Sequence, residues 1–318
     1  TWLLIIPLFL IYNKIFQLYP DKDIFQIGRE VLGRPIFTLL LLVVLADFIL
    51  TLAIVCRNLA ELVKIFLLQT TPLEILLITF IIVSSYLACS EIDVIARASY
   101  FMYPIIILFA LIVVLISFPK ADFTRVFPLF QTDIGSIIKG VKDGFFSFQG
   151  FQVILLAIPL VEKKENTLKS EIIGITTVML IYLLLYIMAL SHFSIGQLSS
   201  IVYPILMLIR QLDLPGFFLE NLDGLLIAFW VIVVFSTTAP VYYGAGKILA
   251  SIIGSKKHKY IILILIPIIY LLAIRPQNFI ELIVDMGYYH SIVSLMSVII
   301  VPVIILIGGL IRKKVLKK

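Results

Sequence analysis

Residues 36–66 read IFTLLLLVVLADFILTLAIVCRNLAELVKIF. Asp47 is the first charged residue of this stretch, and the next is Arg57. A transmembrane helix needs about 20 predominantly apolar residues, so the stretch is long enough to cross a bilayer. Its apolar residues are continuous, whereas a membrane β-strand would alternate apolar and polar residues. The stretch therefore predicts a membrane-spanning α-helix.

The composition of the chain extends this prediction along its length. Of 318 residues, 62% are hydrophobic and 14% are charged, against about 25% charged residues in an ordinary globular domain. This balance excludes a soluble enzyme, a nucleic-acid-binding protein and a disordered regulator. We expect an all-α integral membrane protein with nine spans, at residues 1–18, 36–66, 72–90, 98–118, 145–161, 171–195, 222–247, 259–274 and 289–311.

Basic residues set the expected orientation of these spans. The positive-inside rule places the tail in the cytoplasm and, after nine crossings, Thr1 outside. The tail residues are Arg312, Lys313, Lys314, Lys317 and Lys318. Amphipathic pieces at 23–32, 133–141 and 278–285 are expected to rest at the membrane interface. Because Thr1 leads directly into an apolar helix, we also expect an earlier span to precede it.

The second span carries the deepest charge. Asp47 lies 11 residues after Ile36, which is roughly 16 Å into the membrane. Charges at this depth are costly and mark functional sites. With Thr51 it begins a polar face that Arg57, Asn58 and Glu61 extend, and we interpret this face as a polar relay or gate. The alternative is that Arg57, Glu61 and Lys64 only extend to the outer interface.

The composition of the fifth span predicts an interruption in its helix. It begins Gly144-Phe-Phe-Ser-Phe-Gln-Gly-Phe-Gln152, and glycine weakens a helix. Broken helices of this kind form substrate sites in secondary transporters. The predicted ligand-binding residues here are Ser147, Gln149, Gly150 and Gln152. The alternative is an interfacial helix that continues into a plain span, with its glycines serving helix packing.

The seventh span contains Ser236-Thr-Thr-Ala-Pro-Val-Tyr-Tyr243. Pro240 removes a backbone hydrogen bond, and neighbouring hydroxyls can satisfy the freed carbonyl or coordinate a cation. We predict a cation site at Ser236, Thr237 and Thr238, and a ligand-pocket wall at Thr238, Ala239 and Tyr243. The alternative is a helix kink without a ligand.

Other chemistry is scarce in the sequence. Cys56 and Cys89 lie in apolar runs, and the three histidines, His192, His258 and His290, are far apart without metal-ligand spacing. No nucleophile motif, phosphate loop or dinucleotide fingerprint is present in the sequence. We therefore expect no metal, no cofactor and no enzymatic activity.

Five short strings, in order along the chain, resemble a known family. They are Tyr19-Pro-Asp-Lys22, Cys56-Arg-Asn-Leu-Ala-Glu61, Thr71-Pro-Leu-Glu74, Ile92-Asp-Val-Ile-Ala-Arg97 and Phe148-Gln-Gly-Phe-Gln152. Together they resemble the B subunit of GerA-type spore germinant receptors, in the amino acid–polyamine–organocation superfamily. The strings at 71–74 and 92–97 are the most specific.

This resemblance implies a LeuT-like fold of ten helices in two inverted five-helix repeats. Residues 1–318 would form one transporter-like domain that lacks the first helix. Residues 1–118 would supply helices two to five of the first repeat, and 119–318 the second repeat and the basic cytoplasmic tail. Gln152, Thr238, Tyr243 and the polar face of the second span, including Thr51, would line the pocket. Positions 58 and 152 often carry Glu in the family, so the Asn and Gln found here each remove a carboxylate.

The function implied is nutrient sensing in the inner membrane of the spore. The chain would bind a small nutrient, an amino acid by expectation, and signal to A-type and lipoprotein C-type partner subunits of a germinant receptor. The alternatives are an amino-acid permease working by alternating access and a structural or channel-forming subunit. The sequence names neither the nutrient nor a coupling ion.

Overall fold

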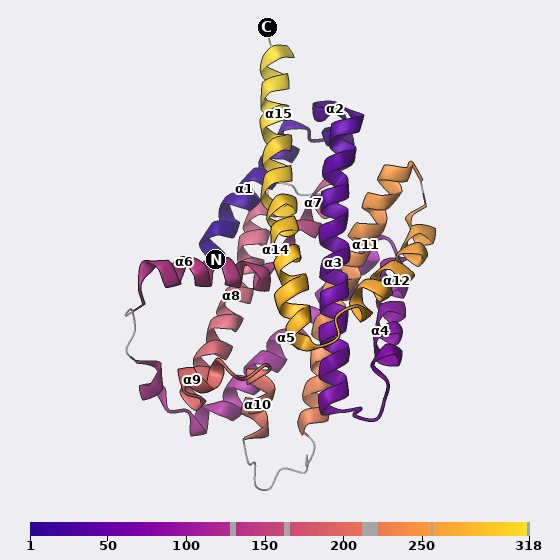
Figure 1. The fold of residues 1–318 in the computed structure, drawn as a ribbon. Coiled ribbons are helices and arrows are strands. Elements are labelled where there is room, and N and C mark those ends of the chain that lie inside the picture. The colour runs from indigo at the N-terminus through magenta and orange to yellow at the C-terminus, as the bar shows by residue number, and fades with distance from the viewer. Residues whose placement is uncertain (128–131, 162–165, 212–221, 256, 317–318) are drawn as a thin grey trace.

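The computed structural model describes residues 1–127, 132–161, 166–211, 222–255 and 257–316, and every regular element in these ranges is a helix (Figure 1). The elements are α1 (Trp2–Leu18), α2 (Ile24–Leu32), α3 (Arg34–Phe66), α4 (Leu73–Ala88), α5 (Ile92–Ser117), η1 (Phe118–Lys120), η2 (Phe123–Val126), α6 (Ile134–Phe145), η3 (Phe146–Phe148), η4 (Phe151–Val153), α7 (Ile154–Ala157), η5 (Ile158–Leu160), α8 (Thr167–His192), α9 (Ile195–Leu198), α10 (Pro204–Arg210), α11 (Leu222–Ile253), α12 (His258–Ile274), α13 (Phe279–Glu281), η7 (Leu282–Met286), α14 (Gly287–Leu295), η8 (Met296–Ile300) and α15 (Val301–Leu316). Lys317 and Lys318 of the predicted cytoplasmic tail lie outside the described residues.

Five helices in the described ranges are long and apolar enough to cross a membrane. They cover Arg34–Phe66, Ile92–Lys120, Thr167–His192, Leu226–Ile253 and Phe279–Lys314. Four shorter apolar helices cover Trp2–Leu18, Leu73–Ala88, Phe151–Leu160 and His258–Ile274. The predicted all-helical fold is therefore confirmed for the described residues, and the lengths and compositions of these helices are consistent with a membrane protein. These helices coincide with the nine predicted segments, while the number of crossings, the LeuT-like arrangement and the inverted repeat stay predictions.

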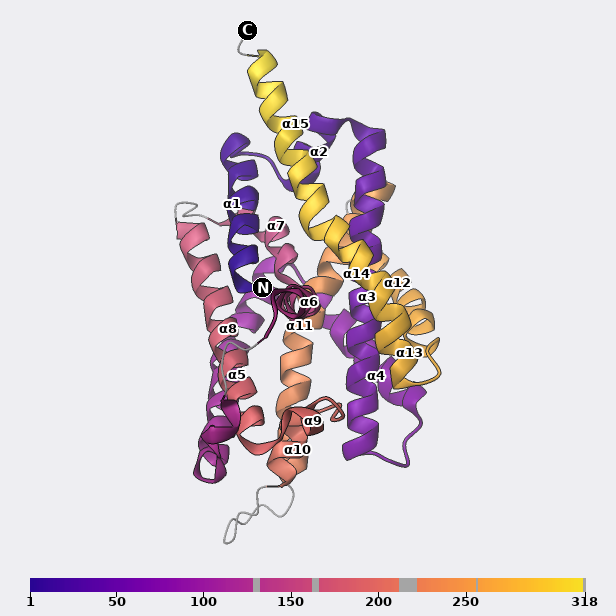
Figure 2. The same cartoon turned by 60° about the vertical axis from the view of Figure 1, so that its left-hand side comes forward.

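The two longest helices, α3 and α11, pack against each other along the middle of the bundle (Figures 1 and 2). Helices α4 and α12 cover them on one side, and α5 packs against α11. The contact is close because Gly244 of α11 has no side chain. A Cβ atom there would lie 2.3 Å from Cε2 of Phe48 on α3. Small residues permit this kind of approach between membrane helices.

The predicted interruption of the fifth span is present. Helix α6 lies across the other helices (Figure 1), and short 3₁₀ segments replace the α-helix on both sides of Gly150. Gly150 has a φ of 106°, in the left-handed region that glycine adopts without a Cβ penalty. Residues 146–160, here called the broken segment, then re-enter the bundle between α1 and α11.

The last span is wound unevenly. Two π-helical turns, Leu282–Met286 and Met296–Ile300, flank the nine residues of α14. The predicted separate interfacial helix at 278–285 is wrong, because α13 runs through the first π turn directly into α14. By contrast, α2 does form after Asp23, which caps it through a capping box with Gln26.

Candidate functional site

Asp47 is fully buried at the middle of α3. The side-chain amide nitrogen of Gln152 donates to its Oδ2 over 3.3 Å. His290 Nε2, on α14, lies 3.3 Å from its Oδ1, close enough for an ion pair without making a hydrogen bond to that oxygen. One carboxylate thus brings together α3, the broken segment and α14, which are far apart in sequence.

Thr51, one turn after Asp47, determines how His290 is oriented. Its hydroxyl donates to the Asp47 backbone carbonyl over 2.8 Å and lies 2.8 Å from His290 Nε2. A threonine hydroxyl has a single hydrogen to donate. Since that hydrogen goes to the carbonyl, Nε2 must carry its own hydrogen and donate it to Thr51. This assignment follows from the hydrogen-bond network.

The broken segment fixes the direction of Gln152. The Gly150 backbone N–H donates to the side-chain oxygen of Gln152 over 2.9 Å, which turns the amide nitrogen toward Asp47. Gln149 donates to the hydroxyl of Ser294 on α14. We refer to Asp47, Thr51, Gln149, Gln152, His290 and Ser294 as the polar cluster.

The space beside the polar cluster is small. A cavity of about 50 Å³ borders Phe48, Gln152 and Ser297. Pockets for small molecules usually enclose about 300–1,000 Å³. A small molecule would therefore fit this cavity only after the broken segment or α14 moves away from α3.

The arrangement of the polar cluster differs from that of a serine-protease-type triad. In a serine-protease-type triad the nucleophile and the carboxylate contact opposite nitrogens of the histidine. Here Thr51 and Asp47 both face the same nitrogen, Nε2. Among the described residues, no group of three or more His, Cys, Asp or Glu side chains is placed to hold a metal ion.

The predicted hydroxyls of the seventh span have hydrogen-bond partners other than Asp47. Thr238 is buried and shares a hydrogen bond of 3.1 Å with Ser84 of α4. The hydroxyls of Ser236 and Thr237 both donate to the Val233 carbonyl. The Thr237 methyl lies beside Gly150, 4.0 Å from where a Cβ would stand. The cation site stays a prediction, and in this conformation its hydroxyls have partners within α11 and α4.

Tyr243 and Ala239 are also buried in α11. Tyr243 lines a different cavity, of about 250 Å³, together with Lys247 and His258. Its ring packs edge-on against His258 at 5.1 Å between ring centroids. Ser147, by contrast, is exposed, and its carbonyl accepts from the Tyr182 hydroxyl. The cavity beside Tyr243 and the cavity beside Gln152 share Leu155 and Leu156 among their lining residues, and the predicted common pocket stays a prediction.

The predicted relay residues farther along α3 form a second polar group. Arg57 is buried and pairs with Glu61 at 2.7 Å. Its guanidinium also donates to the Ala273 carbonyl of α12. Asn58 accepts from the Tyr203 hydroxyl. Ten residues separate Arg57 from Asp47, about 15 Å along a helix, so no direct contact joins the two groups.

Two sets of buried polar residues are not among the site residues predicted from the sequence. His290, Ser294 and Ser297 are buried on the last span, and their spacing of four and three residues places them on one helix face. That spacing was the available signal. The other set is Asn13 and Glu171, whose side chains are joined by a hydrogen bond of 2.6 Å between α1 and α8.

The chain is similar to known proteins over most of its length. Residues 1–281 match the family model described as spore germination protein. The spore germination protein YndE of Bacillus subtilis (strain 168) is 26% identical over 269 residues, covering 85% of this chain and 74% of the relative. Spore germination protein A2 of the same organism is 27% identical, covering 83% and 73%. Spore germination protein B2, also from that organism, is 24% identical, covering 96% and 83%.

Proposed function

We propose, from the premise that this chain belongs to the spore germination protein family, that it is the nutrient-sensing membrane subunit of a germinant receptor. Its ligand class would be a free amino acid. The observation that carries the proposal is the buried Asp47 carboxylate, held between Gln152 of the broken segment and His290 of α14.

The polar cluster has both groups that an amino acid requires. The ammonium group of the amino acid could pair with the Asp47 carboxylate. A carboxylate is a more favourable partner for a cation than a neutral amide. The carboxylate of the amino acid could accept hydrogen bonds from the Gln152 side-chain amide, which now donates to Asp47, and from the His290 N–H. The two charged groups of the amino acid would thus replace the contacts that Asp47, Gln152 and His290 now make within the cluster.

Such a replacement would also transmit a signal. The 50 Å³ cavity is too small for an amino acid, so binding would favour a conformation in which the broken segment has moved. A ligand shifts an equilibrium only by its difference in affinity for the two states. The proposed partners that read this movement are the A-type and lipoprotein C-type subunits, in the inner membrane of the spore.

The test uses spores of a receptor-deleted host that carry the full-length protein with its partner subunits. Asp47→Asn and Gln152→Ala should each reduce the rate of amino-acid-triggered germination at least tenfold, with unchanged protein abundance. Asp93→Asn, at an exposed pair with Arg97, is the matched control. A normal response from both cluster variants would remove the site from consideration.

An uptake measurement separates sensing from transport. Vesicles that contain the purified protein should show no accumulation of labelled amino acid, while still binding it. Saturable uptake that Gln152→Ala abolishes would instead establish the amino-acid permease.

A further inference from the structure

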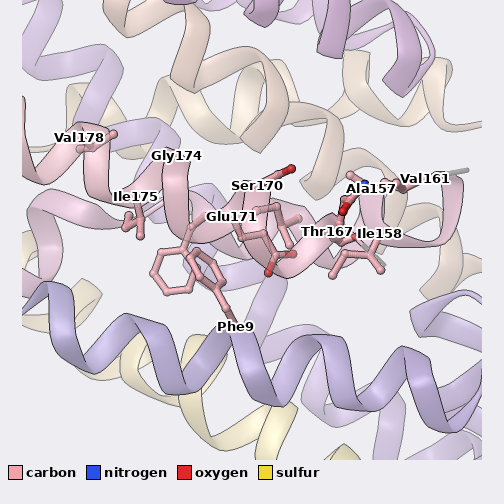
Figure 3. A pocket seen from close by; sticks show the side chains of 13 residues that line it. Phe9, Ala157, Ile158, Val161, Thr167, Ser170, Glu171, Gly174, Ile175 and Val178 are labelled. Carbon is pink, nitrogen blue, oxygen red and sulfur yellow. The ribbon is translucent and has the colours of Figure 1, made fainter. Parts of the chain in front are cut away.

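A large cavity lies on the other side of the broken segment from Asp47. It is partly open and has a volume of about 630 Å³, between α1, residues 151–161 and the first turns of α8 (Figure 3). Most of its lining is apolar, including Phe9, Phe151, Ile158 and Ile175. This volume is typical of small-molecule pockets, which pair apolar walls with a few polar groups.

Among the described residues that line the cavity, Glu171 is the one with a carboxylate. Figure 3 shows this side chain in the same space as Phe9 and Ile158. Glu171 is 7% exposed. Asn13 donates to its Oε2, whereas its Oε1 has no hydrogen-bond partner. The hydroxyl oxygen of Thr167, one turn earlier on the same wall and 8% exposed, has none either.

One carboxylate oxygen and one hydroxyl are therefore buried without a hydrogen-bond partner in one cavity. A buried carboxylate is stable only when it is paired with a cation or neutralised by a proton. Among the described residues that line the cavity, none is basic. If the carboxylate is ionised, its cation comes from outside these residues, and an ammonium group has three donors for such acceptors.

We infer that this cavity binds a primary ammonium group carried on an apolar body, with Glu171 and Thr167 as its acceptors. The ammonium group could belong to a soluble amine or to the headgroup of an aminophospholipid. This site is separate from the proposed amino-acid site and does not depend on it.

The position of Phe151 connects the two sites. Its ring packs on Phe9 and Tyr12 of α1, with ring centroids 5.5 and 6.2 Å apart. The next residue, Gln152, holds Asp47. A molecule that fills the cavity therefore contacts Phe151, and the next residue, Gln152, binds the Asp47 carboxylate. Binding of that molecule would restrain the broken segment.

The experiment uses 2-phenylethylamine as the probe and 2-phenylethanol as its uncharged counterpart. The protein contains two tryptophans, and Trp2 donates to Thr176, directly after the cavity residue Ile175. In a Trp230→Phe background, in phosphatidylcholine nanodiscs, Trp2 fluorescence reports binding. We expect the amine to bind at least tenfold more tightly than the alcohol.

Three variants locate that binding. Glu171→Gln should weaken the amine at least tenfold and leave the alcohol unchanged, whereas Glu74→Gln, at an exposed carboxylate, should change neither. Gly174→Leu should block both probes, because nothing lies within 4 Å of a Cβ at this lining position. This variant also replaces a helical glycine with a better helix former, so it keeps the test decisive if Glu171→Gln fails to fold.

The lipid source is tested by adding phosphatidylethanolamine to the nanodiscs. Loss of the amine response would assign the site to the headgroup, and an unchanged response would assign it to a soluble amine. The inference is overturned if amine and alcohol bind equally, or if the amine binds Gly174→Leu as tightly as the native protein.

Discussion

Asp47 is held by contacts that a hydrophobic side chain could not replace. Asp47→Leu would remove the acceptor that Gln152 uses, and an unsatisfied buried donor costs about 1–3 kcal/mol. We expect the free energy of unfolding in detergent, measured by denaturant titration, to fall by about that amount. Asp93→Asn, at a pair whose side chains are 76% and 64% exposed, should change it by less than about 0.5 kcal/mol. Equal effects of the two variants would contradict this account.

Gly150 is constrained by its backbone rather than by its neighbours. At a φ of 106°, an L-amino acid would be strained by about 1–2 kcal/mol. We expect Gly150→Ala to lower the thermal unfolding midpoint and to displace the Gln152 side chain. Gly140→Ala in α6, where nothing lies within 4 Å of a Cβ, should leave the midpoint unchanged or raise it. A midpoint for Gly150→Ala at or above the native value would refute the strain.

Individual residues could be predicted where the evidence lay within one helix. Asp47 was selected because its depth follows from position along an apolar stretch. The partner His290 was not selected, because its contact with Thr51 joins positions 239 residues apart. No local spacing determines such a pairing. The role of Tyr243 stays a prediction: it lines a cavity of about 250 Å³ that shares Leu155 and Leu156 with the cavity beside Gln152.

The contact between α3 and α11 depends on Gly244. A Cβ at this position would overlap the Phe48 ring, so Gly244→Leu should force the two longest helices apart. Overpacking of this kind costs typically 1–3 kcal/mol, and we expect a lower thermal midpoint together with loss of ligand response. Gly196→Leu, in the short helix α9 with open space around it, serves as the control. A native midpoint for Gly244→Leu would show that the helices can separate without cost.

Asp122 joins the connection after α5, residues 118–127, to the end of α8 by a hydrogen bond. Its backbone N–H donates to the Ser191 carbonyl, and its carboxylate accepts from Thr124 and pairs with Arg125. The side-chain hydrogen bond from Thr124 is the main reason that the pKa of Asp122 lies below its ordinary value of 3.8. Because the pKa is lowered on folding, this stabilisation is complete above pH 3.8 and declines as the pH falls toward the lowered value.

We therefore expect pepsin cleavage within residues 118–127 to accelerate as the pH is lowered from 5 to 2. In Asp122→Asn the cleavage should be fast throughout this range, whereas Asp143→Asn, at an exposed position of α6, should behave as the native protein. A flat profile in the native protein would mean that the carboxylate does not hold this connection.

At the scale of the whole molecule, the predicted orientation can be tested with the two natural cysteines. Cys56 is buried, and Cys89 is half-buried at the end of α4. If the positive-inside rule holds for this chain, Cys89 lies on the cytoplasmic side. A membrane-impermeant maleimide should therefore label inside-out vesicles and not right-side-out vesicles, and Cys89→Ser should abolish the labelling. Labelling from the outer side alone would invert the topology.

The all-helical class of the molecule was predictable because each apolar run is continuous and long enough to predict a helix on its own. The relations between runs were not predictable in the same way. Sequence placed an interruption near Gly150 but not the crosswise direction of α6, since that direction depends on contacts made after the helix ends. Likewise, the residues 278–285 were expected to form a separate helix because nothing local indicates that a π turn can carry the chain onward.

The two π turns around α14 also determine which way His290 faces. Each π turn accommodates one residue more than an α-helix would, and one residue corresponds to about 100° of rotation about the helix axis. Deleting one residue from Leu282–Met286 would therefore change the angular phase between α13 and the rest of the last span. The contact of His290 with Asp47 is thus a matter of helical phase as much as of residue type, and a length change outside the polar cluster could abolish it while every one of its side chains is retained.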